Sequence, residues 1–133
     1  MRLTVLIVSM ATMAGLLVPA VGSAADVTVP ANRESMIGYM TGIADNCHNA
    51  GKPKMDVARE PAHGAVRFQW MKRKIDRKTS VCNGRAVWGM AVFFKPDAGY
   101  RGKDAFSVGM HMQAYVNSTG IRYIKENVSI VVK

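Results

Sequence analysis

Apolar and polar side chains alternate along several segments of this chain. Over residues 65–70 the alternation is regular, as in Val66-Arg67-Phe68-Gln69-Trp70. Because successive side chains of a β-strand point to opposite faces, this period of two predicts a strand with one buried face. Residues 106–116 show the same period, with apolar residues at every even position: Phe106, Val108, Met110, Met112, Ala114 and Val116. We expect these even positions to face the core.

Other segments complete an all-β pattern. Residues 85–94 are apolar with little interruption, which predicts a strand buried on both faces, and residues 127–132 are predicted as a last strand. Residues 35–46 are ambiguous, because their apolar residues have helical spacing whereas Gly38 and Gly42 disfavour a helix. A strand or an irregular edge is the alternative there. Short strands separated by turn-rich segments, without alternating helices, predict an all-β sandwich or barrel.

The first 25 residues have a different pattern. Residues 3–25 carry no charge, follow a positive start at Arg2, and end in small residues just before Asp26. This layout is typical of a cleaved secretory signal peptide. We therefore expect residues 1–25 to be removed and residues 26–133 to form a single domain, periplasmic or secreted. The alternative is a retained membrane anchor. No second apolar stretch is long enough to span a membrane, so no transmembrane segment is expected after processing.

Composition and cysteine count agree with one exported globular domain. Of 133 residues, 49% are hydrophobic and 20% charged, which excludes a disordered polymer. Residues 26–133 carry 17 basic and 9 acidic residues, a net charge of +8. The two cysteines, Cys47 and Cys82, are expected to form a disulfide in an oxidising compartment. A catalytic or metal-binding thiol pair is the alternative, but the close C-x-x-C spacing is lacking.

Two motifs resemble a known family. Pro61-Ala62-His63-Gly64-Ala65-Val66 resembles the P-x-H-G-x-V step of the cadherin-like, immunoglobulin-type repeats of bacterial surface and exported proteins. A segment further along the chain resembles the second motif of these repeats. Its matching residues are Phe94, Pro96, Gly99, Tyr100, Gly102, Asp104 and Phe106. The resemblance covers residues 54–132. It implies an immunoglobulin-like β-sandwich of about seven strands, present here in a single copy, with the disulfide as a staple between the N-terminal segment and the hairpin after Trp70.

The motif residues are explained by folding alone. Gly99 and Gly102 permit the positive φ of tight turns, and Pro96 fixes φ where a strand ends. Asp104 can accept hydrogen bonds from turn amides, and Tyr100 and Phe106 are expected to cap the core. Some members of the family bind calcium between neighbouring repeats. Because the acidic residues of this chain are scattered, we expect neither calcium nor another metal.

The densest chemical feature is a basic segment at residues 72–78. It holds five cations in seven residues between two predicted strands: Lys72, Arg73, Lys74, Arg77 and Lys78. A hairpin loop bearing them would project positive potential into solvent. It is either a solvated loop or a contact for an anionic envelope component (lipopolysaccharide, an acidic glycan or lipid headgroups) or an acidic protein. Nucleic acid is not expected, because the chain is exported and no aromatic residues are interleaved with the cations.

Methionine and histidine suggest a second chemistry. Seven of the ten methionines lie beyond residue 25, and with His48, His63 and His111 they suggest a copper(I) site. Met110 and Met112, however, are predicted on the face opposite His111, so these three side chains cannot converge on one ion. No motif of a catalytic histidine, serine or lysine is present, so neither an enzyme nor a cofactor is expected. Trp70 or Trp88 is expected to fill the core centre or pack against the disulfide, with exposure for sugar stacking as the alternative.

Taken together, the sequence predicts a non-enzymatic, adhesion-type binding module of the bacterial envelope that contacts an anionic partner through the basic segment. A periplasmic copper-handling protein is one alternative. A structural domain that assembles through its edge strands is another. The pattern leaves the oligomeric state open.

Overall fold

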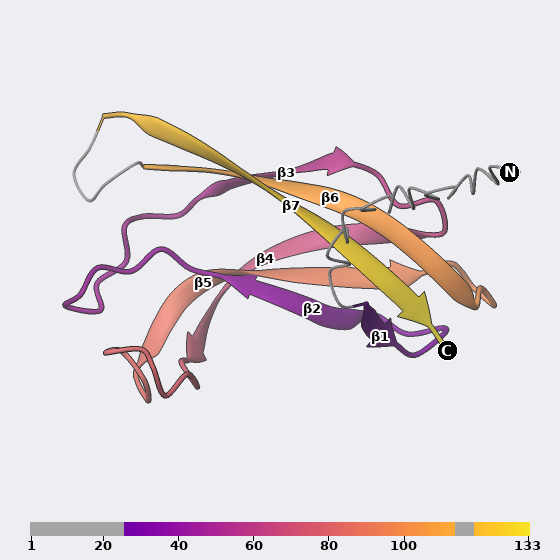
Figure 1. The fold of residues 1–133 in the computed structure, drawn as a ribbon, viewed down its shortest axis with the longest axis horizontal. Helices are drawn as coiled ribbons and strands as arrows, with labels where there is room; N and C mark the ends of the chain where they lie inside the picture. Colours follow the sequence, from indigo (N-terminus) through magenta and orange to yellow (C-terminus); the bar gives the residue numbers. More distant parts are fainter. Residues whose placement is uncertain (1–25, 114–118) are drawn as a thin grey trace, which may run out of the picture.

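The computed structural model describes residues 26–113 and 119–133, and this part of the chain contains strands and no helix (Figure 1). The predicted signal peptide lies outside the described residues. None of the described residues forms a helix that could cross a membrane. The seven strands are β1 (Val27–Val29), β2 (Ser35–Met40), β3 (Lys54–Arg59), β4 (Gly64–Lys74), β5 (Ala86–Pro96), β6 (Gly102–Gln113) and β7 (Ile121–Val132).

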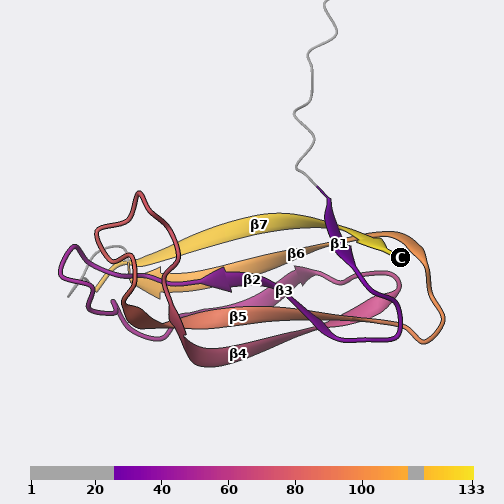
Figure 2. The same cartoon turned by 90° about the horizontal axis from the view of Figure 1, so that it is seen from below.

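The strands form two sheets that pack face to face, in the orders β1-β7-β6-β3 and β2-β5-β4. Figure 2 shows β6 and β7 in one layer and β4 and β5 in the other. The division of β2, β4 and β5 from β3, β6 and β7 is that of the B, D, E and C, F, G strands of a constant-type immunoglobulin domain. Here β1 pairs in parallel with β7. The predicted immunoglobulin-like β-sandwich of about seven strands is confirmed.

The core lies between the two sheets and is centred on two phenylalanines. Phe94 of β5 and Phe106 of β6 are both 0% exposed, and their rings stack with centroids 5.8 Å apart. The aliphatic residues that complete the buried cluster are Val29, Val92, Val108, Ile130 and Val132. Phe106 and Val108 of β6 belong to this cluster and Met110 is also buried, as the alternation predicts. The predicted positions Ala114 and Val116 lie outside the described residues. Neither Trp70 nor Trp88 belongs to it, so the expectation that a tryptophan fills the core centre is wrong: the two phenylalanines occupy that place.

Several strands differ in extent from the sequence prediction. The first part of the ambiguous segment forms β2, a strand with a bulge between Met36 and Gly38, and residues 41–46 belong to the connection that follows it. β4 continues four residues past Trp70, and β7 begins six residues before Asn127. β1 and β3 were not predicted at all. In each case pairing with a neighbouring strand holds the segment extended. The partners of β1, β2 and β3 are distant in sequence, whereas β4 and β7 are lengthened by pairing with the adjacent strand of a hairpin.

The family-like motifs meet at the end of the sandwich where β3 turns into β4 and β5 into β6. The carboxylate of Asp104 on β6 accepts hydrogen bonds from the backbone N–H groups of Ala62 and His63, at 3.0 and 2.8 Å. His63, two residues after Pro61, stacks on Tyr100 with the ring centroids 4.1 Å apart. Gly99 and Gly102 have φ values of 75° and 132°. Asp104 thus ties β6 to the turn that crosses between the two sheets. These turn amides lie 41 and 42 positions from Asp104, whereas the sequence predicts a local contact.

Gly64 starts β4 where no side chain fits. A Cβ atom there would lie 2.5 Å from the Phe94 ring and 2.8 Å from the carbonyl oxygen of Lys95. Gly64→Ala is therefore expected to lower the free energy of unfolding by about 1–3 kcal/mol through overpacking of the core. Urea denaturation followed by tryptophan fluorescence measures this change.

Gly38→Ala is the matched control, since a Cβ at Gly38 would lie 3.9 Å from its nearest neighbour, Val92. This variant should be as stable as the original protein or slightly more stable, because alanine restricts the unfolded chain. Equal stability of the two variants would contradict the assignment of Gly64 to a close packing contact.

Candidate functional site

Two long connections lie together at the other end of the sandwich, on the left of Figure 1. They are residues 41–53, between β2 and β3, and residues 75–85, between β4 and β5. A disulfide joins Cys47 of the first to Cys82 of the second, with Cα atoms 5.6 Å apart, and Cys82 is 1% exposed. The predicted disulfide is confirmed. It holds two loops that the sheets themselves leave unpaired.

Hydrogen bonds from two side chains fix the first connection to β5. The Asn49 amide donates to the carbonyl oxygen of Trp88 at 2.5 Å and accepts from its N–H at 3.2 Å. The Thr41 hydroxyl donates to the same carbonyl at 2.6 Å. β2 has ended at Met40, so Asn49 supplies the pair of hydrogen bonds that one further strand residue would have made.

The structure places the five predicted cations in two settings. Lys72, Arg73 and Lys74 belong to β4, paired with Trp88, Val87 and Ala86 of β5, whereas Arg77 and Lys78 lie in the connection. The expectation that one loop carries all five is therefore wrong. Backbone pairing extends the strand regardless of charge, and the side chains of all five stay exposed.

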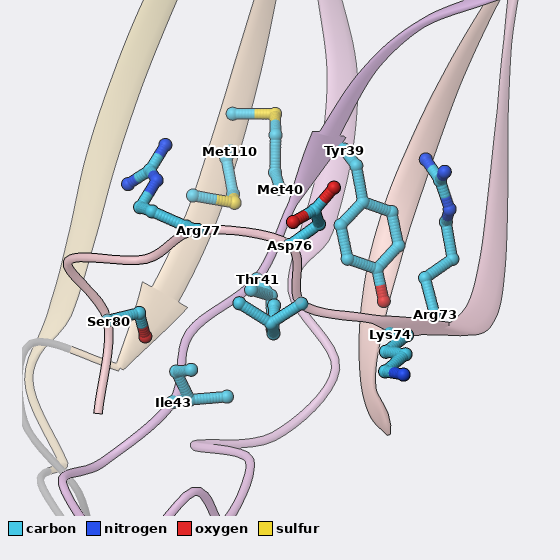
Figure 3. A pocket seen from close by; sticks show the side chains of 11 residues that line it. Tyr39, Met40, Thr41, Ile43, Arg73, Lys74, Asp76, Arg77, Ser80 and Met110 are labelled. Atoms are coloured by element: carbon cyan, nitrogen blue, oxygen red, sulfur yellow. The ribbon is translucent and has the colours of Figure 1, made fainter. Parts of the chain in front are cut away.

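A groove of about 610 Å³ opens between the end of β2 and the β4–β5 connection (Figure 3). We call it the loop groove. Three of the five cations line it: Arg73, Lys74 and Arg77. Its other lining residues are Tyr39, Met40, Thr41, Ile43, Ile75, Asp76, Ser80 and Met110. Lys72 and Lys78 do not line it.

The charge in the loop groove is unbalanced. Ion pairs within 4.0 Å among the described residues join Arg67 to Glu34 and His111 to Asp56, and neither involves the basic segment. Three cations therefore face a single acidic group, Asp76, with which they form no such pair. The arrangement favours an anion over a cation.

Tyr39 and Arg73 form one wall of the loop groove. The Arg73 guanidinium lies 5.5 Å from the centroid of the Tyr39 ring. The Tyr39 hydroxyl donates to the carbonyl oxygen of Val87 at 2.7 Å and lies 3.1 Å from that of Met71. Burial raises the pKa of Tyr39, and its hydrogen bonding and the charge of Arg73 oppose the shift. The wall residue is therefore neutral in the physiological range.

The two tryptophans lie beside the groove rather than in the core. Trp70 and Trp88 stack on each other with centroids 5.8 Å apart, and Trp88 is 43% exposed. Trp70 pairs with Met90 and Trp88 with Lys72, so both rings lie on the same face of the β4–β5 pair.

The histidines are separated from one another. His48 lies in the β2–β3 connection, His63 in the β3–β4 turn, and His111 on β6. Met110 is buried in the core, and the His111 ring contacts Tyr123 and lies 3.1 Å from an Asp56 carboxylate oxygen. The predicted separation of the methionines from His111 is confirmed. Within residues 26–113 and 119–133, no three His, Cys, Asp or Glu side chains gather closely enough to hold a metal ion.

Sequence reasoning missed the part of the loop groove that comes from other strands. Met40 and Ile43 follow β2, and Met110 comes from β6 in the opposite sheet. In the sequence each of these three has the spacing of an ordinary core residue, and no local pattern places any of them near Arg77. Asn49 lies in a turn-rich segment of the sequence, and the residue that it contacts, Trp88, is 39 positions away.

No protein-family model, curated protein or solved structure matches this chain. The loop groove and its charges are therefore the basis for assigning a function.

The disulfide should contribute much of the stability of this end. Replacing Cys47 and Cys82 together by alanine is expected to lower the free energy of unfolding by roughly 3–4 kcal/mol, because the unfolded chain regains the freedom of a 34-residue loop. Urea denaturation of the oxidised protein and the double variant measures this difference. Overlapping unfolding curves would show that the disulfide does not contribute to the free energy of unfolding.

Asn49→Ala removes both hydrogen bonds to the Trp88 backbone. It should cost about 1–3 kcal/mol, since the Trp88 N–H loses its partner and the Trp88 carbonyl keeps only the hydrogen bond from Thr41. It should also speed amide exchange at Trp88, measured by hydrogen–deuterium exchange. Asn46→Ala is the control, because that side chain accepts only from the neighbouring His48 N–H. If both variants exchange alike at Trp88, Asn49 does not brace the loop.

Proposed function

We propose that this chain is a non-enzymatic, exported binding module of the bacterial envelope that contacts an anionic partner through its basic segment. The observation that carries the proposal is the loop groove, which Arg73, Lys74 and Arg77 line without an ion-pair partner among the described residues. Holding like charges on one braced hairpin costs free energy, and a bound anion offsets that cost.

The scaffold supports the same interpretation. The immunoglobulin-like sandwich presents the groove at one end, and the motifs that resemble bacterial cadherin-like repeats tie its other end together. The signal-like first 25 residues and the disulfide between Cys47 and Cys82 agree with a periplasmic or secreted protein. None of these features supplies a reacting group, so a binding role is the simplest one.

Charge argues against the two alternatives. Met40 and Met110 offer thioethers for copper(I), but they share the groove with three cations that oppose a metal cation. The edge strands of the two sheets are β1, β3, β2 and β4, and β4, the longest of the four, carries Lys72, Arg73 and Lys74. Cations on an edge strand disfavour pairing with an identical edge. An anionic partner satisfies the same charges.

The test compares two variants with the same loss of charge. Arg73→Gln, Lys74→Gln and Arg77→Gln together empty the groove of cations. Arg59→Gln, Arg122→Gln and Lys125→Gln together remove three exposed cations from the other sheet. Binding to vesicles that contain phosphatidylglycerol is measured by co-sedimentation at several salt concentrations. The groove variant should bind roughly tenfold more weakly, from three lost charge contacts.

The control variant should stay within about twofold of the original protein, because its cations lie outside the groove. Equal losses in both variants would mean that net charge alone attracts the vesicles. Unchanged binding by a folded groove variant would remove the basic segment from the contact.

A further inference from the structure

An open aromatic surface lies on the β4–β5 hairpin, at the end of the sandwich that carries the loop groove. Trp88 is an even number of residues from Val92 and Phe94, so it is on the face of β5 that carries the core. Trp88 is nevertheless 43% exposed, whereas Val87, on the opposite face, is 3% exposed. Figure 1 shows the hairpin bending away from β6 and β7 here. The core face of β5 is therefore open to solvent at Trp88.

The Trp88 indole is held in a fixed position. Its backbone carbonyl accepts hydrogen bonds from Asn49 and Thr41, and its N–H donates to Asn49. Trp70 stacks on it with the ring planes 12° apart. Among the described residues, no cation lies over either indole. The uncovered part of the ring is thus a flat apolar surface that needs no rearrangement before it binds a ligand.

Two lysines follow the aromatic pair on the same face. Lys72 pairs directly with Trp88 across the strands, and Lys74 pairs with Ala86. Trp70, Lys72 and Lys74 alternate along β4, so they share one face and are spaced about 7 Å apart. Neither lysine has an ion pair within 4.0 Å among the described residues. We call the surface formed by Trp70, Trp88, Lys72 and Lys74 the tryptophan face.

The tryptophan face combines a flat ring with a row of positive charges. A pyranose ring has a face of C–H groups, which packs on an indole, and its hydroxyl groups point outward from the ring edge to water. An acidic peptide would satisfy the lysines and leave the indole in water. A neutral sugar would cover the indole and leave the lysines without a partner. A sugar chain that carries carboxylates satisfies both.

We propose that the tryptophan face binds an acidic polysaccharide, with one sugar ring on Trp88 and carboxylates of the chain at Lys72 and Lys74. This inference rests on the proposed anion-binding function and names its partner. The polysaccharide runs along β4, because the lysines follow the tryptophans in that direction. Lys74 also lines the loop groove, so the two surfaces are continuous. Each cation contacts its own carboxylate, and no single anion has to reach all of them.

The test compares three hexamers. Hexagalacturonate has sugar rings and carboxylates, cellohexaose has the rings without the charge, and hexaglutamate has the charge without the rings. Each is titrated into the oxidised protein by isothermal calorimetry at two salt concentrations. Hexagalacturonate should bind roughly tenfold more tightly than either of the others, because it alone satisfies both the indole and the lysines.

Tryptophan variants test the stacking. Trp88→Leu keeps an apolar side chain but removes the flat ring, so it should weaken hexagalacturonate by roughly tenfold and leave hexaglutamate unchanged. Trp88→Tyr should restore most of the affinity, which separates stacking from a change in the fold. Tyr123→Leu is the matched control, since Tyr123 is 48% exposed but lies on β7 in the other sheet. It should change neither affinity.

A lysine variant tests the charge contacts. Lys72→Gln should weaken hexagalacturonate by about two- to fivefold at low salt and leave cellohexaose unchanged. Lys125→Gln is the control, because it removes an exposed cation from the other sheet.

The outcomes separate the inference from the proposed function. Equal affinity for hexagalacturonate and hexaglutamate, unchanged by Trp88→Leu, would overturn the polysaccharide inference and leave an anion-binding module. Equal losses in Trp88→Leu and Tyr123→Leu would also overturn it. Binding to phosphatidylglycerol vesicles but to no hexamer would replace the polysaccharide by a lipid surface. Binding to neither would overturn both the inference and the proposed function.

Discussion

The packing of β5 on β6 through Phe94 and Phe106 is the contact on which the rest of the structure depends. Each ring is 0% exposed, and each strand is flanked on both sides within its own sheet. Burial of apolar surface here holds the two sheets face to face. The β2–β3 and β4–β5 connections, which surround the loop groove, join strands that either belong to this pair or are hydrogen-bonded to it.

The two ends of the sandwich are closed by different means. At one end the Asp104 carboxylate of β6 accepts hydrogen bonds from the β3–β4 turn, which crosses from the sheet of β6 to the other sheet. At the other end the disulfide between Cys47 and Cys82 joins two loops, and Asn49 extends the pairing of β5. The loop groove opens beside this second closure. Its lining combines Met110 of one sheet with Tyr39, Met40 and the basic residues of the other.

The position of the cations follows from strand alternation as much as from the loop. Arg73 and Lys74 are neighbours in sequence but point to opposite faces of β4, because successive strand residues do so. They line one groove because it lies where β4 ends and the chain bends across β2. Backbone pairing with β5 therefore fixes the positions of Arg73 and Lys74, and the disulfide-bonded connection carries Arg77. The fold decides where these side chains point, and the sequence decides how many cations there are.

Period-two alternation and turn residues determined the all-β class, the buried face of β6 and the roles of Gly99 and Gly102, because these depend on neighbours a few positions apart. The cysteine count determined the single disulfide. The sequence did not reveal β1, β3 or the partner of Asn49, because those depend on hydrogen bonds to strands far away in the chain. It did not reveal the length of β4 either, because the charged residues at its end are held extended by pairing with β5. The basic segment was visible as five cations. Only the tertiary structure brought three of them beside Met40 and Met110, since contacts between the two sheets have no signature in local spacing.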